Sequence, residues 1–233
     1  MKAISSMATR HVLADLAAAA VQEGLSELEI ESVGGVDAAK RVAAGEPFDL
    51  VFLASDALAR LAADGHVDPA TVRPLVLSQV AVAVPSGSTE PTIRPEGVAF
   101  TDANGVREAM RAAPRIGYST GPSGTTLVQM IDGWGLAGEV GDRLVQARPG
   151  IPVAKLLADG EVDLGFQQLS ELVGQPGVRI LGVLPADCAI DTVFSGAVAM
   201  TAVDPAAAQA VLDFMGSDAA APIKLAHSFG VPQ

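Results

Sequence analysis

The sequence predicts an α/β protein of two Rossmann-like lobes, each built on a mixed sheet in which parallel strands dominate. Three strands alternate with three helical patterns within about the first 65 residues, and such alternation builds a parallel sheet with right-handed crossovers. Two long β-branched segments, residues 75–85 and 192–201, break this alternation and are expected to cross between the lobes. Nearly half of the 233 residues are apolar but only 4% are aromatic, which suits helices packed on a sheet.

The first lobe is expected to begin with a strand at residues 2–6 and a helix at 7–23, whose apolar positions recur at helical spacing. A strand at 27–32 then leads into a helix at 38–44. The continuous apolar run at 48–53 is typical of a buried parallel strand, and a helix at 57–64 is expected to follow it.

The second lobe is expected to consist of a loop, three helices and four strands. The predicted elements are a loop at 86–97, helices at 104–113, 125–134 and 153–159, and strands at 116–118, 143–147, 163–166 and 178–184. Two final helices, 205–215 and 218–227, are assigned to the first lobe. The predicted lobes are therefore residues 1–80 with 197–233, and residues 81–196.

The stretch Arg115–Met130 contains a short strand, six small residues at 119–124, and a helical pattern that opens at Thr125. The first N–H groups of a helix have no intrahelical partner, and the helix dipole makes that end slightly positive. Such a turn can bind an anion. The simpler alternative is that Ser123 caps the helix and contacts no ligand.

Composition and charge exclude several classes of function. The formal net charge of -12 and the scarcity of aromatic residues argue against nucleic acid and anionic membranes as partners. No apolar run approaches the roughly 20 residues of a membrane helix. Cys188 is the single cysteine, and the three histidines lack metal-ligand spacing. We therefore expect no metal and no cofactor, and a small-molecule anion as the partner.

Residues 1–13 lack the charged head, apolar stretch and cleavage site of a secretory leader. This indicates a cytoplasmic protein as the sequence stands, or a periplasmic one from which a leader was removed.

Ligands of open parallel sheets bind beyond the carboxyl ends of the strands. In this sequence small, hydroxyl and amide residues recur at those ends, and the cleft between the lobes is where they are expected to meet. The candidate ligand-binding residues are Ser5, Ser6, Gly34, Gly35, Ser119, Thr120, Ser123, Gly124, Thr125, Arg148, Ile151, Gln167 and Gln168.

Four segments, in order, resemble the type II periplasmic binding proteins, in the molybdate-binding-protein-like branch of the solute-binding proteins. They are the Ser5–Ser6 turn, residues 32–56 (SVGGVDAAKRVAAGEPFDLVFLASD), the crossing segment LVLSQVAVAVP, and the tail AAQAVLDFMGSDAAAPIKLAHSFG. The resemblance covers nearly the whole chain. It implies a two-lobed fold with a ligand in the cleft.

The resemblance also implies roles for particular residues. Molybdate binders hold their ligand with two hydroxyls, backbone N–H groups and a tyrosine. Ser6 or Ser5 matches the first hydroxyl, but Gly34 and Gly35 stand where the second is usual, and Gln167 and Gln168 stand where the tyrosine is usual. The backbone donors fall near 123–124 and 150–152. These departures favour a larger organic anion with two or three carboxylates.

The stretches GYSTGPSG (117–124) and LGFQQLS (164–170) are similar to aconitate isomerase, an enzyme class with the same two-lobed fold. This resemblance implies an allylic proton transfer that isomerises an aconitate-like polycarboxylate. Such chemistry needs a general base, and the candidates are Asp56, which could instead cap a helix, and His11, which could be a solvated surface residue. Arg148 could pair with a substrate carboxylate.

The alternative function is a non-catalytic solute-binding protein for molybdate-like or tungstate-like oxyanions, or for an organic acid. Only under this alternative is an ABC permease expected as a partner.

Two short motifs point elsewhere and are set aside. Residues 117–121 read GxSxG, the nucleophile string of hydrolases, but Pro122 and Gly124 delay the helix that such an elbow needs. The string GPSGTT resembles a phosphate loop but lacks the lysine that contacts the phosphates.

Overall fold

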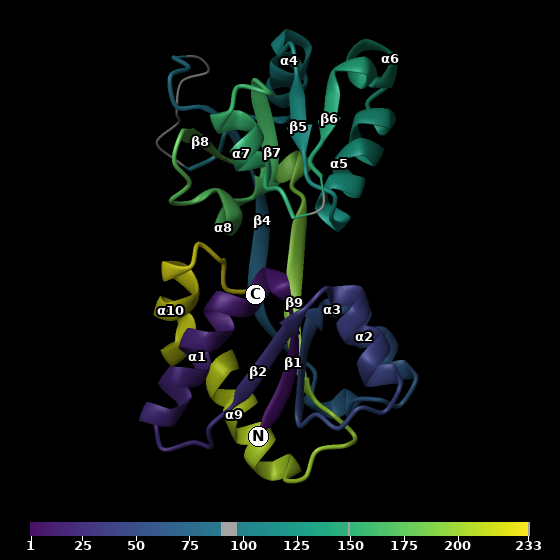
Figure 1. Cartoon of the computed structure of the whole chain (residues 1–233), viewed down its shortest axis with the longest axis vertical. Coiled ribbons are helices and arrows are strands. Elements are labelled where there is room, and N and C mark those ends of the chain that lie inside the picture. Colours follow the sequence, from purple (N-terminus) through teal and green to yellow (C-terminus); the bar gives the residue numbers. More distant parts are fainter. Residues whose placement is uncertain (90–96, 149, 233) are drawn as a thin grey trace. The chain divides into compact units, whose positions relative to one another are not determined.

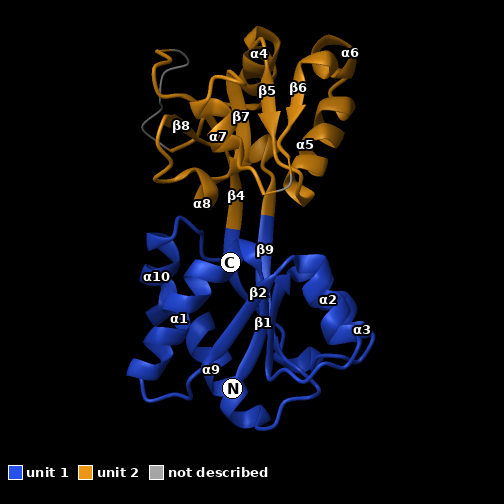
Figure 2. Cartoon of the chain, viewed as in Figure 1, with its two compact units in different colours: residues 1–77, 192–233 blue, residues 78–191 orange. Residues whose placement is uncertain are grey.

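The structure is a computed structural model that describes residues 1–89, 97–148 and 150–232 (Figure 1). It divides into two compact units (Figure 2), residues 1–77 with 192–233 and residues 78–191. The chain passes from one unit to the other within two long strands, β4 (Arg73–Pro85) and β9 (Asp191–Val198). Unit 2 is thus one continuous segment, whereas unit 1 is assembled from both ends of the described chain.

Unit 1 contains a sheet in the order β2-β1-β3-β9. The strand β1 (Lys2–Ser6) runs parallel to β2 (Glu29–Val33) and to β3 (Leu50–Ala54), and β9 runs antiparallel to β3. The helices of this unit are α1 (Arg10–Gln22), α2 (Gly35–Ala43), α3 (Ser55–Ala63), α9 (Pro205–Gly216) and α10 (Ala221–Ala226). Short 3₁₀ turns occur at Met7–Thr9, Pro69–Thr71 and Asp218–Ala220.

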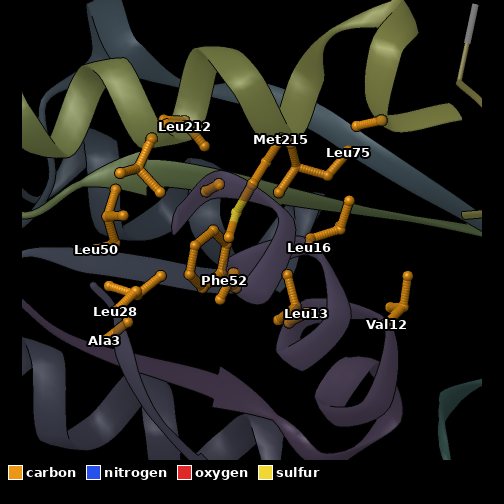
Figure 3. Close-up of a cluster of buried hydrophobic side chains, with 14 of the residues drawn as sticks. Ala3, Val12, Leu13, Leu16, Leu28, Leu50, Phe52, Leu75, Leu212 and Met215 are labelled. Atoms are coloured by element: carbon orange, nitrogen blue, oxygen red, sulfur yellow. The ribbon is translucent and has the colours of Figure 1, made fainter. Parts of the chain in front are cut away.

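Helices cover both faces of this sheet, which explains the continuous apolar run of β3. Successive strand residues point to opposite faces. Accordingly Phe52 packs with α1 and α9, where Figure 3 shows Met215 of α9 pointing towards its ring. Val51 and Leu53 pack in the other cluster, with buried residues of α2 and α3. Each fully buried large side chain contributes about 1.5–3 kcal/mol.

Unit 2 also contains parallel and antiparallel strands together with helices, but its strands follow one another in a different order. Its parallel strands are β6 (Leu144–Gln146), β5 (Ile116–Tyr118) and β7 (Leu164–Gln168), in that order, and β7 pairs antiparallel with β4, which also pairs with β8 (Val178–Val183). The helices are α4 (Ala103–Ala112), α5 (Pro122–Gly133), α6 (Ala137–Val140), α7 (Val153–Ala158) and α8 (Leu169–Leu172). Short 3₁₀ turns occur at Gly141–Arg143 and Ala186–Cys188.

The predicted fold class, a mixed α/β protein whose sheets are mainly parallel, is confirmed. Several predicted helix boundaries were wrong. The helices expected at 38, 57 and 125 begin earlier, at Gly35, Ser55 and Pro122, because small residues and proline fit the first turn of a helix. The final expected helix is split into a 3₁₀ turn and the short α10. None of the helices in the described residues is long and apolar enough to span a bilayer.

Candidate functional site

Three strands of unit 1 end directly at the start of helical structure. The residues that precede the first helical turns are Ser6 at the end of β1, Gly34 after β2 and Ala54 at the end of β3. None of the three makes a side-chain hydrogen bond that caps the following turn. The free N–H groups of these turns are therefore available to an external acceptor.

The hydroxyl of Ser6 is buried at this edge and has no partner. Ser6 is 6% exposed, and among the described residues its Oγ makes no hydrogen bond. A Cβ atom placed on Gly35 would lie 3.6 Å from the Cβ of Ser6, so the start of α2 is within van der Waals distance of Ser6. Thr9 Oγ1 donates to the Ser6 carbonyl at 3.3 Å and fixes the intervening turn. A buried hydroxyl without a partner needs an explanation, and a bound ligand oxygen would supply one.

Other hydroxyls at this edge are already paired. Ser5 Oγ lies 2.8 Å from Ser32 Oγ and so links β1 to β2. Ser55 Oγ lies 2.6 Å from Ser195 Oγ and donates to the Val193 carbonyl at 2.9 Å, linking the start of α3 to β9. Ser6 therefore differs from Ser5, although the sequence offered both as candidates.

The two candidate bases of unit 1 are exposed side chains. Asp56 lies in the first turn of α3 and accepts a hydrogen bond from Arg60 at 3.1 Å, with 72% of its side chain exposed. It is therefore not the helix cap that the simpler interpretation proposed. His11 is exposed in the first turn of α1, where Arg10 Nε lies 2.9 Å from its Nε2.

In unit 2 the hydroxyl-rich turn connects β5 to α5. Ser119 Oγ lies 3.2 Å from Ser123 Oγ, and Ser123 is 7% exposed. A Cβ atom on Gly124 would lie 1.8 Å from the Ser119 carbonyl oxygen, so only glycine fits there. Because α5 begins at Pro122, Ser123 and Gly124 lie in its first turn instead of preceding it. Thr120 and Thr125 are exposed.

The two glutamines at the end of β7 make hydrogen bonds within unit 2. Gln167 is 4% exposed; its Oε1 accepts from the backbone N–H of Ala154 at 3.2 Å, and its Nε2 donates to Glu171. Gln168 Oε1 accepts a hydrogen bond from Ser78 Oγ on β4. The side chain of Gln167 thus satisfies a free N–H at the start of α7 and also holds a carboxylate.

Glu171, which the sequence reasoning did not single out, lies in α8 immediately beyond β7. The residue is exposed as a whole, but its carboxyl group lies against Gln167. Partial burial raises the pKa of this carboxyl above its ordinary value, while the hydrogen bond from Gln167 opposes the change. The sequence did contain a signal for this residue, because Glu171 is an acidic residue that closely follows a buried strand ending in Gln167 and Gln168.

Arg148 and Ile151 lie on the surface of unit 2 between β6 and α7. The Ile151 N–H donates to the Arg148 carbonyl at 2.9 Å, and Ile151 is 38% exposed. Pro149, part of the same predicted segment, lies outside the described residues. Arg148 is exposed, so its guanidinium is free to meet solvent.

A hollow of about 650 Å³ lies at the opposite edge of the unit 1 sheet. Its lining includes Glu27, Glu29 and Asp49, with Lys2. The carboxylates outnumber the two cationic groups of this lining, which are Lys2 and the ammonium group of Met1, so the hollow does not suit an anion and is not the candidate site. No group of three histidine, cysteine or acidic residues in the described ranges could hold a metal ion.

Comparison with known proteins gives one family and one curated relative. The model of the family described as bacterial extracellular solute-binding protein matches residues 1–230. An aconitate isomerase from Pseudomonas sp is 32% identical over 185 residues, which cover 78% of this chain and 66% of that protein. The match thus spans slightly less than two thirds of the relative's length.

Solved structures with the same fold include three proteins from transport systems. One is described as the substrate-binding domain of a molybdenum ABC transporter from Clostridium difficile (TM-score 0.82, 14% identity, covering 100% of this chain and 99% of that one). The periplasmic molybdate-binding protein of Azotobacter vinelandii has a TM-score of 0.72 and 22% identity, with both chains fully covered. A tungstate ABC transporter structure from Geobacter sulfurreducens has a TM-score of 0.69 and 15% identity, with 97% of each chain covered. At these identities the likeness concerns the fold alone.

Proposed function

Because this chain belongs to the bacterial extracellular solute-binding protein family, we propose that it binds a small organic anion with two or three carboxylates and isomerises it by allylic proton transfer. The proposed substrate class is that of aconitate. The binding part rests on the geometry of unit 1, and the catalytic part rests on the aconitate isomerase relative.

The observation that carries the binding part is the buried hydroxyl of Ser6, which has no partner among the described residues. It lies between the uncapped first turns that follow β1 and β2. A carboxylate oxygen would accept from this hydroxyl and from the free N–H groups of α2, and hydrogen bonds to a charged acceptor are stronger than neutral ones. In a protein of net charge -12, local donors of this kind are what an anion requires.

The side chains next to these donors favour an organic ligand. Met7, directly after Ser6, is 46% exposed, and Val36, directly after Gly35, is 69% exposed. A hydrocarbon backbone would bury part of their apolar surface, at about 25 cal/mol per Å². A hydrated tetrahedral oxyanion would gain nothing from them.

The catalytic part of the proposal is based on the relative that is named as an aconitate isomerase. Moving a double bond along a polycarboxylate requires a base that removes a proton from a methylene, and donors that stabilise the developing enolate charge. Hydroxyl and N–H donors are present at the strand ends of both units. The substrate and activity of the relative come to this chain only as part of this proposal.

A second candidate is a non-catalytic binding protein that delivers an oxyanion or an organic acid to an ABC permease. The family description, which concerns extracellular solute binding, favours it. It also supports a location outside the cytoplasm, in contrast to the cytoplasmic expectation drawn from residues 1–13. Under this alternative the hydroxyl of Ser6 still binds the ligand, but no bond in the ligand changes.

Thermal unfolding with added ligands tests the binding part. A tricarboxylate such as cis- or trans-aconitate should raise the Tm more than molybdate or tungstate does, and a ligand at 100 times its Kd should stabilise by about 2.7 kcal/mol. Ser6→Ala should weaken binding of aconitate about 10- to 100-fold, yet leave the Tm of the free protein equal or higher because an unpaired buried hydroxyl is removed. Ser26→Ala, an exposed serine, is the matched control. A shift produced by the oxyanions alone would contradict the choice of ligand.

Proton NMR in D2O tests the catalytic part. Incubation with cis-aconitate should change the cis to trans ratio and introduce deuterium at the exchanged carbon. If the ligand binds but the ratio and the deuterium content stay unchanged, the second candidate is correct.

A further inference from the structure

One carboxylate of unit 2 is held in a fixed place at the carboxyl end of the sheet. Glu171 accepts a hydrogen bond from Nε2 of Gln167, whose Oε1 is in turn occupied by the backbone N–H of Ala154. Because Gln167 is 4% exposed and both ends of its amide are engaged, it cannot rotate without losing a buried hydrogen bond. The orientation of the Glu171 carboxylate is therefore set by β7 and α7 together.

The same edge carries the hydroxyl-rich turn. Strands β5 and β7 are parallel neighbours in which Tyr118 pairs with Phe166. The next residues along each strand, Ser119 and Gln167, are therefore at the same end of the sheet. Gln167 engages Oε2 of Glu171, and no hydrogen bond to Oε1 is found among the described residues, so this oxygen can accept from a molecule bound at this edge.

We propose that Glu171 is the general base of the isomerisation and that Gln167 is its positioning residue. This inference rests on the proposed function. The Glu171 carboxylate takes a proton from the substrate methylene, and the electron pair of the broken C–H bond spreads over the allylic carbons and the adjacent carboxylate. The resulting carboxylic acid returns the proton to the other end of the allylic system, where a new C–H bond forms and the double bond is displaced. No oxidant or second substrate is consumed.

The electrostatics of Glu171 suit this role. Burial raises the pKa of its carboxyl above the ordinary value, which makes the carboxylate a stronger base. The elements packed against α8 are β7, which carries no charged residue, and β8, which carries Arg179. The raised pKa comes from burial and not from a neighbouring charge.

The two bases expected from the sequence lack such support. Asp56 is paired with Arg60 at the surface of α3, and His11 is bonded to the adjacent Arg10. Neither is held by a buried side chain, so neither is fixed in one orientation as the carboxylate of Glu171 is.

The test compares three variants of the full chain with cis-aconitate as substrate. Glu171→Gln should lower kcat about 100-fold or more, while the aconitate Kd measured by calorimetry stays within about threefold. Glu161→Gln, which removes an exposed carboxylate before the opposite end of β7, should leave kcat unchanged. Gln167→Met should keep measurable activity but move the acidic limb of the pH profile of kcat/KM to higher pH, because the hydrogen bond that stabilises the carboxylate is lost.

The outcomes separate the inference from the proposed function. If the wild-type protein binds aconitate without isomerising it or exchanging its protons, the proposed function fails and the assignment of a base fails with it. If the wild-type protein isomerises aconitate and Glu171→Gln does so within about threefold of the same rate, the assignment alone is overturned. Should Gln167→Met not fold, the kcat and Kd of Glu171→Gln still decide.

Discussion

Lys224 is the most unusual charged residue of unit 1, because only 1% of its surface is exposed. It lies in α10, whose first residues follow the 3₁₀ turn that contains Asp218. Burial lowers the pKa of its ammonium group below the ordinary value of 10.5, and the charge of Asp218 partly opposes this. A buried lysine that must carry its charge at neutral pH costs the folded state free energy.

Replacing Lys224 with Met should raise the free energy of unfolding at neutral pH. Between the lowered pKa and 10.5 the unfolded chain binds a proton that the folded chain does not, so wild-type stability should rise with pH through that window. The advantage of Lys224→Met should therefore shrink as pH approaches 10.5. Urea unfolding at pH 7 and pH 10 measures both effects, with Lys40→Met, an exposed lysine, as control. A loss of stability at pH 7 would show that the ammonium group is stabilised by its surroundings.

At this scale the sequence could place a side chain at a strand end but could not say what the side chain contacts. It identified Ser5, Ser6, Gln167 and Gln168 by their positions after strands. Only the packed structure distinguishes the unpaired hydroxyl of Ser6 from the paired one of Ser5. It alone shows that Ala154 of α7 and Glu171 occupy the amide of Gln167, because the hydrogen-bond partners of a side chain depend on how the elements pack and not on its place in a strand.

At the scale of an element, α5 shows how a turn and a helix fit together. Proline in the first position of a helix loses nothing, since its missing N–H would have had no partner. Pro122 takes this position, and Gly124 allows the Ser119 carbonyl to lie against the helix. The pattern in the sequence instead predicted that the helix opens at Thr125, after the six small residues 119–124, although Pro122 suits the first position of a helix.

Gly124→Ala should destabilise the protein by roughly 1–3 kcal/mol, because the added methyl would overlap the Ser119 carbonyl and force the turn to move. Gly133→Ala is the matched control within α5. Nothing lies within 4 Å of a Cβ atom placed there, so that change should be neutral or stabilising by up to about 1 kcal/mol. Chemical denaturation of both variants checks the pair, and equal losses of stability would refute the close contact.

The sequence predicted most elements of regular structure because their periodicity is local. Both faces of β3 are covered, so its continuous apolar run was informative. The short helices α6 and α8 were not predicted, since a helix of four residues is too short to show a periodic pattern of apolar residues. The 3₁₀ turn at Met7–Thr9 was included in the helix that follows it, because sequence patterns define helix ends poorly.

At the scale of the whole molecule, the net charge of -12 affects how an anion approaches the protein. The electrostatic field of this charge repels a tricarboxylate, whereas the hydrogen-bond donors at the strand ends attract it only at short range. Salt screens the first effect far more than the second, since the Debye length is about 10 Å at 0.1 M.

We therefore expect aconitate to bind more tightly as NaCl rises from low to near-physiological concentration, by up to about threefold. Isothermal titration calorimetry at two salt concentrations and constant pH measures the change. Repeating the low-salt titration with an osmotically matched concentration of sucrose is the control. Weaker binding with added salt would mean that a local positive charge, such as that of Arg10 or Arg148, dominates the approach of the ligand.

The discontinuity of unit 1 has a consequence for synthesis on the ribosome. Its core joins Phe52 of β3 to Leu212 and Met215 of α9, yet about 160 residues separate them in the chain. Unit 2 is continuous and can complete its own core first. The strands β1 to β3 are made before unit 2, but part of their apolar surface stays uncovered until α9 is translated. During synthesis these strands are therefore exposed to aggregation for longer than the core of unit 2.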